Sequence, residues 1–421
     1  MRRPKILTTL QTYDLALFRA DLLAGITVAM VALPLSLAIA IASGADPAQG
    51  LVTAAVAGFL ISALGGSRVQ VGGPTGAFIV VVFDVVARHG IDGLITATFM
   101  AGVILLIAGY LRLGRLIRMI PEAVIEGFTI GIALVIATSQ VKFVLGLEIA
   151  DDPADFLEKL PVLWVARDSI DALSAALGVA TIALIVLIRR LSPRLPGLIL
   201  AVGAMSLLVA VAGLDIDTVA ARFGALPSGL PAPHLPDLSL ARLRELAAPA
   251  LVIAFLAGVE SLLSAIVADR MIGGAHRPNA ELLAQGAANI GSALFGGLPA
   301  TGAIARTATN IRAGGRTPVA GIVHALVILA AIYLLSDLAG YLAMPALGGL
   351  LMLVAWNMSE PHRWRERLAM RRADLGLMLL TAVLTVLVDL TVAIGTGVAL
   401  GLAIRLRRRE VPLPDWTPPD R

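Results

Sequence analysis

Two charged side chains lie within otherwise apolar sequence, and they are the residues best placed to bind ions. Glu260 is in the middle of apolar residues 249–268, with Ser261 and Ser264 at neighbouring helical positions. A carboxylate at membrane depth is costly without a partner, so Glu260 could hold a proton or Na⁺. Arg306 could attract an anion at a similar depth. A structural ion pair, for instance between Glu260 and Arg306, is the alternative interpretation, and the sequence leaves it open.

The same kind of helix break occurs twice. Residues 72–78 read Gly-Gly-Pro-Thr-Gly-Ala-Phe, and residues 297–304 read Gly-Leu-Pro-Ala-Thr-Gly-Ala-Ile. A helix cannot continue through such a break, but it can begin there, because proline suits the first turn. Thr75 and Thr301 would place hydroxyls near these starts. Small residues alone often serve close helix packing, but two matched breaks are the best sequence indicator of a transporter binding site.

The composition indicates an integral membrane protein. Of the 421 residues 58% are hydrophobic and 15% charged, whereas soluble domains carry roughly 25% charged residues. There is no cysteine, which excludes disulfides and thiol catalysis, and the five histidines lack metal-ligand spacing. No nucleophile–base pair is evident, so we expect neither an enzyme nor a cofactor, apart from a coupling H⁺ or Na⁺. The net charge of +4 comes with arginines that flank apolar segments, which favours membrane topology over nucleic-acid binding.

The elements that must position Glu260, Arg306 and the breaks are apolar segments long enough for a bilayer. We predict an all-α membrane protein with about fourteen transmembrane segments, seven on each side of a Pro- and Asp-rich stretch at residues 213–245. The third and tenth segments are half-length helices that begin at the breaks, with short extended pieces before them. The predicted segments are residues 21–43, 48–64, 74–87, 94–111, 121–141, 172–188, 195–211, 249–268, 279–295, 299–313, 319–335, 341–357, 375–388 and 390–404.

The distribution of arginine supports this count and orients the chain. Arginines gather in the turns after every second segment, whereas the opposite turns are mainly acidic. The positive-inside rule then places the basic turns and both termini in the cytoplasm of a multi-pass inner-membrane protein. The predicted parts are a cytoplasmic lead-in (1–20), a first repeat (21–212), an extracellular or periplasmic loop (213–245), a second repeat (246–408) and a cytoplasmic tail (409–421).

An odd number of segments in each half predicts an inverted repeat. The second half must then enter the membrane in the opposite orientation, so the two half-helices run oppositely and their N-termini approach each other near the midplane. Each helix N-terminus carries a partial positive charge and free N–H groups. Two such ends facing one cavity would form an anion site.

At these motifs the chain resembles the SulP (sulfate permease) family of anion transporters, over nearly its whole length. The stretches that carry the resemblance are residues 21–27 with 32–34, 72–77, 260–269 with 279–282, 285–286 and 289–290, and 295–321. The resemblance implies a core domain and a gate domain, with the substrate between segments one and eight and the two half-helix starts. It assigns Glu260 and Ser264 to the coupling ion, which could be Na⁺ at Glu260, and it places Arg306 beside the anion. The substrate site would comprise Leu35, Ile39, Gly76, Ala77, Phe78, Thr301, Gly302, Ala303 and Arg306.

Two departures from the family pattern bear on function. Many members have glutamine directly after the proline of the first segment, where this chain has Leu35, so bicarbonate and dicarboxylates are candidate substrates beside sulfate. Most members continue into a cytoplasmic STAS domain, whereas none is expected in residues 409–421. Gly397 and Gly401 form a small-xxx-small pair that is weak evidence for helix packing, and we expect a homodimer in the lipid bilayer.

The predicted function is secondary active transport of a small anion by alternating access, coupled to H⁺ or Na⁺. A nucleobase permease of the same architecture is one alternative, and competition by uracil or xanthine would identify it. An anion channel is another alternative, and unitary currents would identify it.

Overall fold

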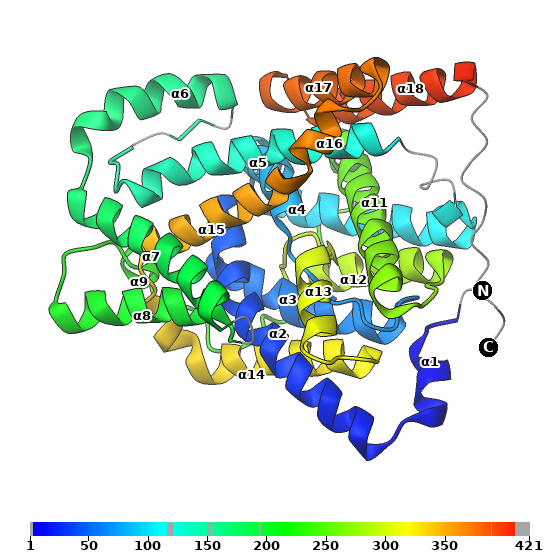
Figure 1. Cartoon of the computed structure of the whole chain (residues 1–421), viewed down its shortest axis with the longest axis horizontal. Helices are drawn as coiled ribbons and strands as arrows, with labels where there is room; N and C mark the ends of the chain where they lie inside the picture. The colour runs from blue at the N-terminus through cyan, green and yellow to red at the C-terminus, as the bar shows by residue number, and fades with distance from the viewer. Residues whose placement is uncertain are drawn as a thin grey trace.

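The computed structural model describes residues 3–115, 121–149, 152–153, 155–192, 195–388 and 390–408. The fold is almost entirely helical (Figure 1). In these ranges, seven helices are long and apolar enough to cross a membrane: Leu15–Ala42, Pro47–Leu64, Gly76–Tyr110, Glu122–Val144, Ala172–Leu191, Ala247–Ile272 and Pro318–Gly340. The predicted cytoplasmic tail at residues 409–421 lies outside the described residues.

One group of helices, here called the core bundle, contains both breaks. Its elements are α2 (Leu15–Ala42), α3 (Pro47–Leu64), α4 (Ile79–Tyr110), α11 (Ala247–Ile272), α12 (Pro278–Leu294), α13 (Ile304–Arg312) and α14 (Pro318–Gly340). Helix α2 packs on α3 and α14, and α12 packs on both α3 and α4. The short helix α13 contacts α2 and α11, so the second break lies inside this bundle (Figure 1).

The second group, here called the flanking bundle, packs along one side of the first. Its elements are α5 (Glu122–Val144), α7 (Ala172–Leu191), α8 (Gly197–Ala212), α15 (Met344–Met358), α17 (Arg372–Leu387) and α18 (Leu390–Arg408). Helix α5 is central, because it contacts both α15 and α17, and α17 packs in turn on α18 (Figure 1). Helix α15 also packs on α7 and reaches α2 of the core bundle.

Short elements connect these helices. They are α1 (Ile6–Thr9), η1 (Leu10–Thr12), η2 (Gly76–Phe78), η3 (Leu113–Arg115), α6 (Phe156–Val165), η5 (Ala166–Ser169), α9 (Val219–Phe223), α10 (Leu240–Glu245), η6 (Pro361–Arg363) and α16 (Trp364–Leu368). The Pro- and Asp-rich stretch therefore contains two short helices, and its Val219 N–H donates to the Leu342 carbonyl at 2.9 Å.

The predicted third and fourth segments follow each other directly, joined by a kink rather than by a loop. Helix α4 runs from Ile79 to Tyr110, and only Gly90 departs from helical geometry inside it, with φ 70° and ψ 179°. That positive φ suits glycine, which has no Cβ to clash. Gly90 therefore divides α4 into two helical parts, and these correspond to the two predicted segments.

The helix ends follow local chemistry. Asp46 caps α3 by accepting from the Ala48 N–H, Gln49 completes a capping box, and Pro47 occupies the first turn. Thr317 and Pro318 start α14 in the same way. These signals precede apolar runs and satisfy N–H groups that have no partner within the helix.

Glycine pairs bring the core helices into backbone contact. A Cβ on Gly102 of α4 would lie 2.8 Å from the Gly286 carbonyl oxygen of α12, and a Cβ on Gly286 would lie 2.7 Å from that of Gly102. Lipid tails are as apolar as leucine, so helices in a bilayer associate largely through such close packing. The core bundle that holds the breaks is therefore tightly built.

Candidate functional site

The two breaks meet each other directly. Strand β1 (Gly72–Gly73) pairs antiparallel with strand β2 (Thr301–Gly302), with Gly72 opposite Gly302 and Gly73 opposite Thr301. All four residues are buried. Element η2 follows β1 and helix α13 follows β2, so the pairing brings the starts of both half-helices next to one small sheet.

The prediction that both half-helices begin at their prolines is wrong. Element η2 begins at Gly76 and α13 at Ile304, beyond Pro74 and Pro299 respectively. The residues between each proline and its helix are extended, since Thr75 has φ −128° and ψ 156°, and Thr301 lies in β2. The backbone N–H and C=O groups of the breaks are thus partly satisfied by the sheet, as burial away from water requires.

Arg306 lies in the first turn of α13 and is only 1% exposed. Its Nη1 donates to the Gly72 carbonyl at 3.3 Å, and its Nη2 donates to Ser36 Oγ of α2 at 3.0 Å. It forms no ion pair with Glu260, so the structural alternative that the sequence left open is not what the structure shows. A buried guanidinium whose hydrogen-bond partners are neutral has no carboxylate in direct contact and can attract an anion.

Gly73 makes room for that guanidinium. Its φ is +150°, and a Cβ at this position would lie 1.9 Å from Arg306 Nη1. No residue with a side chain fits there unless the arginine moves. The first break therefore positions the cation of the second.

We predict that Gly73→Ala abolishes most transport activity, because it displaces Arg306 Nη1 and strains the backbone. The expected loss is about tenfold or more, the size of one lost hydrogen bond to a charged group. Initial uptake rates in proteoliposomes, normalised to folded protein by size-exclusion chromatography, measure this. Gly203→Ala on α8 is the control, since its Cβ would meet nothing within 4 Å. Equal activity of the two variants would contradict the positioning role of Gly73.

Glu260 lies at the other half-helix start. Its Oε2 accepts a hydrogen bond from Thr75 Oγ1 at 3.0 Å, and Thr75 directly precedes η2. The side chain of Glu260 is partly exposed, whereas that of Ser261 beside it is fully buried. One half-helix start thus carries a carboxylate and the other a guanidinium.

Ser264 has a different neighbour from Glu260. Its hydroxyl lies 3.3 Å from Thr307 Oγ1 of α13, and Thr307 Oγ1 also accepts from the Val71 N–H at 3.1 Å. The two residues expected to serve the coupling ion therefore bond to different elements, although they lie four residues apart on one helix face.

The other predicted substrate residues are buried, and Thr301 and Ala303 form hydrogen bonds at the same sheet. Thr301 Oγ1 donates to the Ala257 carbonyl of α11 at 3.0 Å. The single hydroxyl hydrogen of Thr301 is therefore engaged within the protein. The Ala303 N–H donates to the Val71 carbonyl at 3.0 Å. Leu35 adjoins Ser36, the partner of Arg306. Buried side chains or glycines occupy all of these positions: Leu35, Ile39, Gly76, Ala77, Phe78, Thr301, Gly302 and Ala303.

A polar network that the sequence reasoning missed supports the breaks from behind. Gln70 Nε2 donates to Ser261 Oγ at 2.8 Å, and Ser261 Oγ donates to Glu281 Oε1 at 3.0 Å. Glu281 is fully buried, and its Oε2 accepts from the Gly66 N–H at 2.8 Å. Gln285 adds a bond to Ser261 Oγ at 2.7 Å. The signal was available, because Glu281 and Gln285 lie four residues apart within an apolar segment, where polar groups must find partners.

Comparison with known proteins places these features among anion transporters. The model of the sulfate permease family matches residues 18–381. Over 397 residues the chain is 40% identical to the putative sulfate transporter YvdB of Bacillus subtilis, covering 94% of this chain and 75% of the relative. Over 404 residues it is 31% identical to the bicarbonate transporter BicA of a Picosynechococcus species, covering 93% of this chain and 70% of the relative.

Solved structures agree in fold. The transmembrane domain of a cyanobacterial bicarbonate transporter, BicA, superposes with a TM-score of 0.82 at 31% identity, covering 90% of this chain and 98% of that one. The murine anion transporter Slc26a9 in its inward-facing state gives a TM-score of 0.87 over 96% of this chain and 71% of that one. At 18% identity the second likeness concerns the fold alone.

Proposed function

Since the chain belongs to the sulfate permease family, we propose that it is a secondary active transporter that moves a small anion across the cytoplasmic membrane by alternating access. Its relatives are named as transporters of sulfate or bicarbonate, and it is a multi-pass membrane protein. The single observation that carries the proposal is the pairing of β1 with β2, which joins two half-helix starts beside the buried cation Arg306.

The anion would bind between the two half-helix starts. Free N–H groups at the start of each half-helix would donate to its oxygens, and Arg306 would supply the compensating charge. The predicted residues from Leu35 to Arg306 would line the site, with Gly76 and Ala303 next to the helix starts. The substrate class is a small anion such as bicarbonate, sulfate or a dicarboxylate.

Glu260 would hold the coupling ion, H⁺ or Na⁺, with Ser264 contributing from the same helix. Thr75 supports this role, because its hydroxyl bonds to Glu260 and its backbone leads into the first half-helix. Occupancy of Glu260 and occupancy of the anion site would thus act on the same short stretch of chain.

Alternating access would arise from movement of the core bundle against the flanking bundle. In this proposal the core bundle carries the site and the flanking bundle is the gate. Fourteen segments in a seven-plus-seven inverted repeat, cytoplasmic termini and a homodimer are part of the same proposal, and the basic turns on one side support the orientation.

A counterflow panel tests the function. Purified protein in proteoliposomes is loaded with sulfate, bicarbonate, chloride or succinate, and exchange for labelled external anion is measured at two pH values, with and without Na⁺. Saturable exchange of at least one anion is the expected result. Unitary currents without saturation would indicate a channel, and inhibition by uracil but not by anions would indicate a nucleobase permease.

A further inference from the structure

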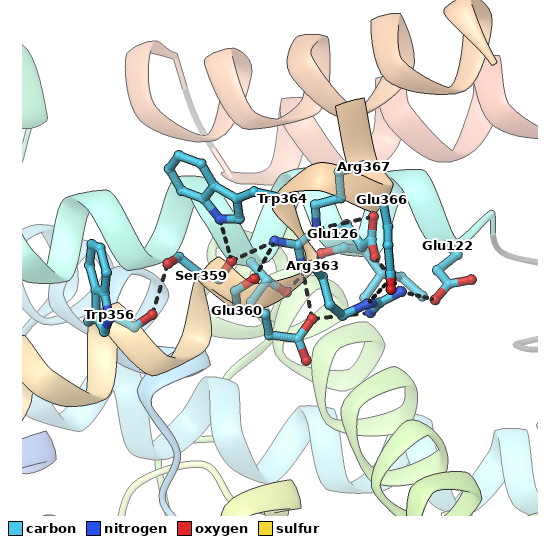
Figure 2. A network of polar contacts seen from close by, with 11 residues as sticks. Glu122, Glu126, Trp356, Ser359, Glu360, Arg363, Trp364, Glu366 and Arg367 are labelled. Carbon is cyan, nitrogen blue, oxygen red and sulfur yellow. Dashed lines mark hydrogen bonds and ion pairs between the residues drawn. The ribbon is translucent and has the colours of Figure 1, made fainter. Parts of the chain in front are cut away.

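An ion cluster joins α5 to the segment between α15 and α17. Glu126 of α5 is 5% exposed, and its Oε1 lies 3.0 Å from Arg363 Nη2 (Figure 2). Its Oε2 lies 3.5 Å from Nε of Arg367, which is 3% exposed. Burial alone would lower the pKa of Arg363, but hydrogen bonds to Glu122 and Glu360 and the charge of Glu126 raise it, so this guanidinium stays charged.

The same cluster clamps the end of α15. Arg367 Nη1 donates to the Ser359 carbonyl at 2.5 Å, and Trp364 Nε1 donates to the same carbonyl at 3.0 Å (Figure 2). Arg367 Nη2 donates to Glu360 Oε2 at 2.9 Å. Glu360 itself has a left-handed backbone, with φ 44° and ψ 65°, which is uncommon for a residue with a side chain. These contacts hold the turn through which the chain leaves α15, directly after its last residue, Met358.

Met358 faces the first half-helix start. Its Sδ lies 3.0 Å from the position that a Cβ on Gly76 would occupy, and Ile136 Cδ1 of α5 lies 3.6 Å from that position. Gly76 is the first residue of η2. Two apolar side chains of the flanking bundle, Met358 and Ile136, thus lie nearest to Gly76 at the start of the half-helix.

We propose that Met358 limits the size of the transported anion at Gly76, and that the Glu126–Arg363–Arg367 cluster positions Met358 to do so. The proposal rests on the function proposed above. Methionine is long and flexible, so its backbone must be held if it is to act as a wall of defined depth. The cluster supplies that restraint, because the buried Arg367 guanidinium lies beside Glu126 and donates hydrogen bonds to both Ser359 and Glu360.

Size selectivity tests the role of Met358. The half-inhibitory concentrations of bicarbonate and succinate are measured against uptake of whichever labelled anion exchanges in the counterflow panel. Met358→Ala should lower the succinate-to-bicarbonate ratio of these concentrations by about tenfold, since removing a few methylene-sized groups from a fitted pocket changes discrimination by that order. Leu379→Ala on α17, which is 53% exposed, is the matched control and should leave the ratio unchanged.

The positioning role of the cluster is tested by the same succinate-to-bicarbonate ratio, and not by the transport rate alone. Arg367→Gln and Glu126→Gln should shift the ratio in the direction of Met358→Ala. Asp168→Asn, whose side chain is 86% exposed and lies outside the cluster, should not. If either cluster variant fails to fold, Met358→Ala still decides the proposal. Wild-type transport with an unchanged ratio in Met358→Ala would overturn this inference and leave the proposed function standing. Absence of any anion exchange by the wild type would instead overturn the proposed function.

Discussion

Replacing Arg306 with glutamine is expected to weaken the apparent affinity for the transported anion by about 30-fold or more. Loss of one partner of a buried charge interaction costs about 2–5 kcal/mol, and each 1.4 kcal/mol is about tenfold. Arg306 is buried, and its protein partners are the Gly72 carbonyl and the Ser36 hydroxyl, neither of which carries charge. The anion would therefore be the negatively charged group in direct contact with this cation. Saturation curves of uptake in proteoliposomes measure the change.

Two further variants make the result specific. Arg306→Lys should retain part of the affinity, because the charge remains while the two-armed contact to Gly72 and Ser36 is lost. Arg312→Gln, on an exposed part of the same helix, should leave the affinity unchanged. An Arg306→Gln protein that binds anion as tightly as the wild type would show that the guanidinium only links β1 to α2 and does not bind the anion.

The second large effect is expected for Glu260→Gln, which should abolish concentrative uptake while leaving exchange measurable. Glutamine can still accept the hydrogen bond from Thr75, so the half-helix start keeps its support, but an amide cannot take up a proton. A gradient of one pH unit can drive about a tenfold accumulation for each coupled proton. The accumulation ratio should therefore fall from about ten to about one. Uptake with imposed pH and Na⁺ gradients distinguishes the two coupling ions.

Counterflow under the same conditions is the internal control, because it needs substrate binding and movement but no driving ion. Glu245→Gln provides the matched variant, since Glu245 is a carboxylate of the short helix α10 that pairs with Arg242 away from the breaks. Glu260→Gln protein that still concentrates the anion with wild-type dependence on pH and Na⁺ would refute the coupling role.

Local chemistry explains why much of the fold could be predicted. Apolar runs, the capping residues Asp46 and Thr317, and glycine-proline breaks act within a few residues of chain, so they can be recognised without knowing the neighbours. The same is true of Glu260 and Arg306, because any charge within an apolar segment stands out. The sequence by itself therefore determined the helical class, the two breaks and the two charged side chains that merit testing.

The hydrogen-bond and packing partners of these residues could not be predicted in this way, because they come from distant parts of the chain. The proline rule suggested that helices start at Pro74 and Pro299, but the backbone of the two breaks is better satisfied as strands once they pair with each other. Charge made Glu260 one possible ion-pair partner of Arg306. In the tertiary structure the guanidinium instead donates hydrogen bonds to Ser36 and Gly72. The position of Met358 over Gly76 has no local signature at all. Packing of the two bundles decided these contacts, since a contact between residues hundreds of positions apart depends on the whole arrangement of helices and on no short stretch of sequence.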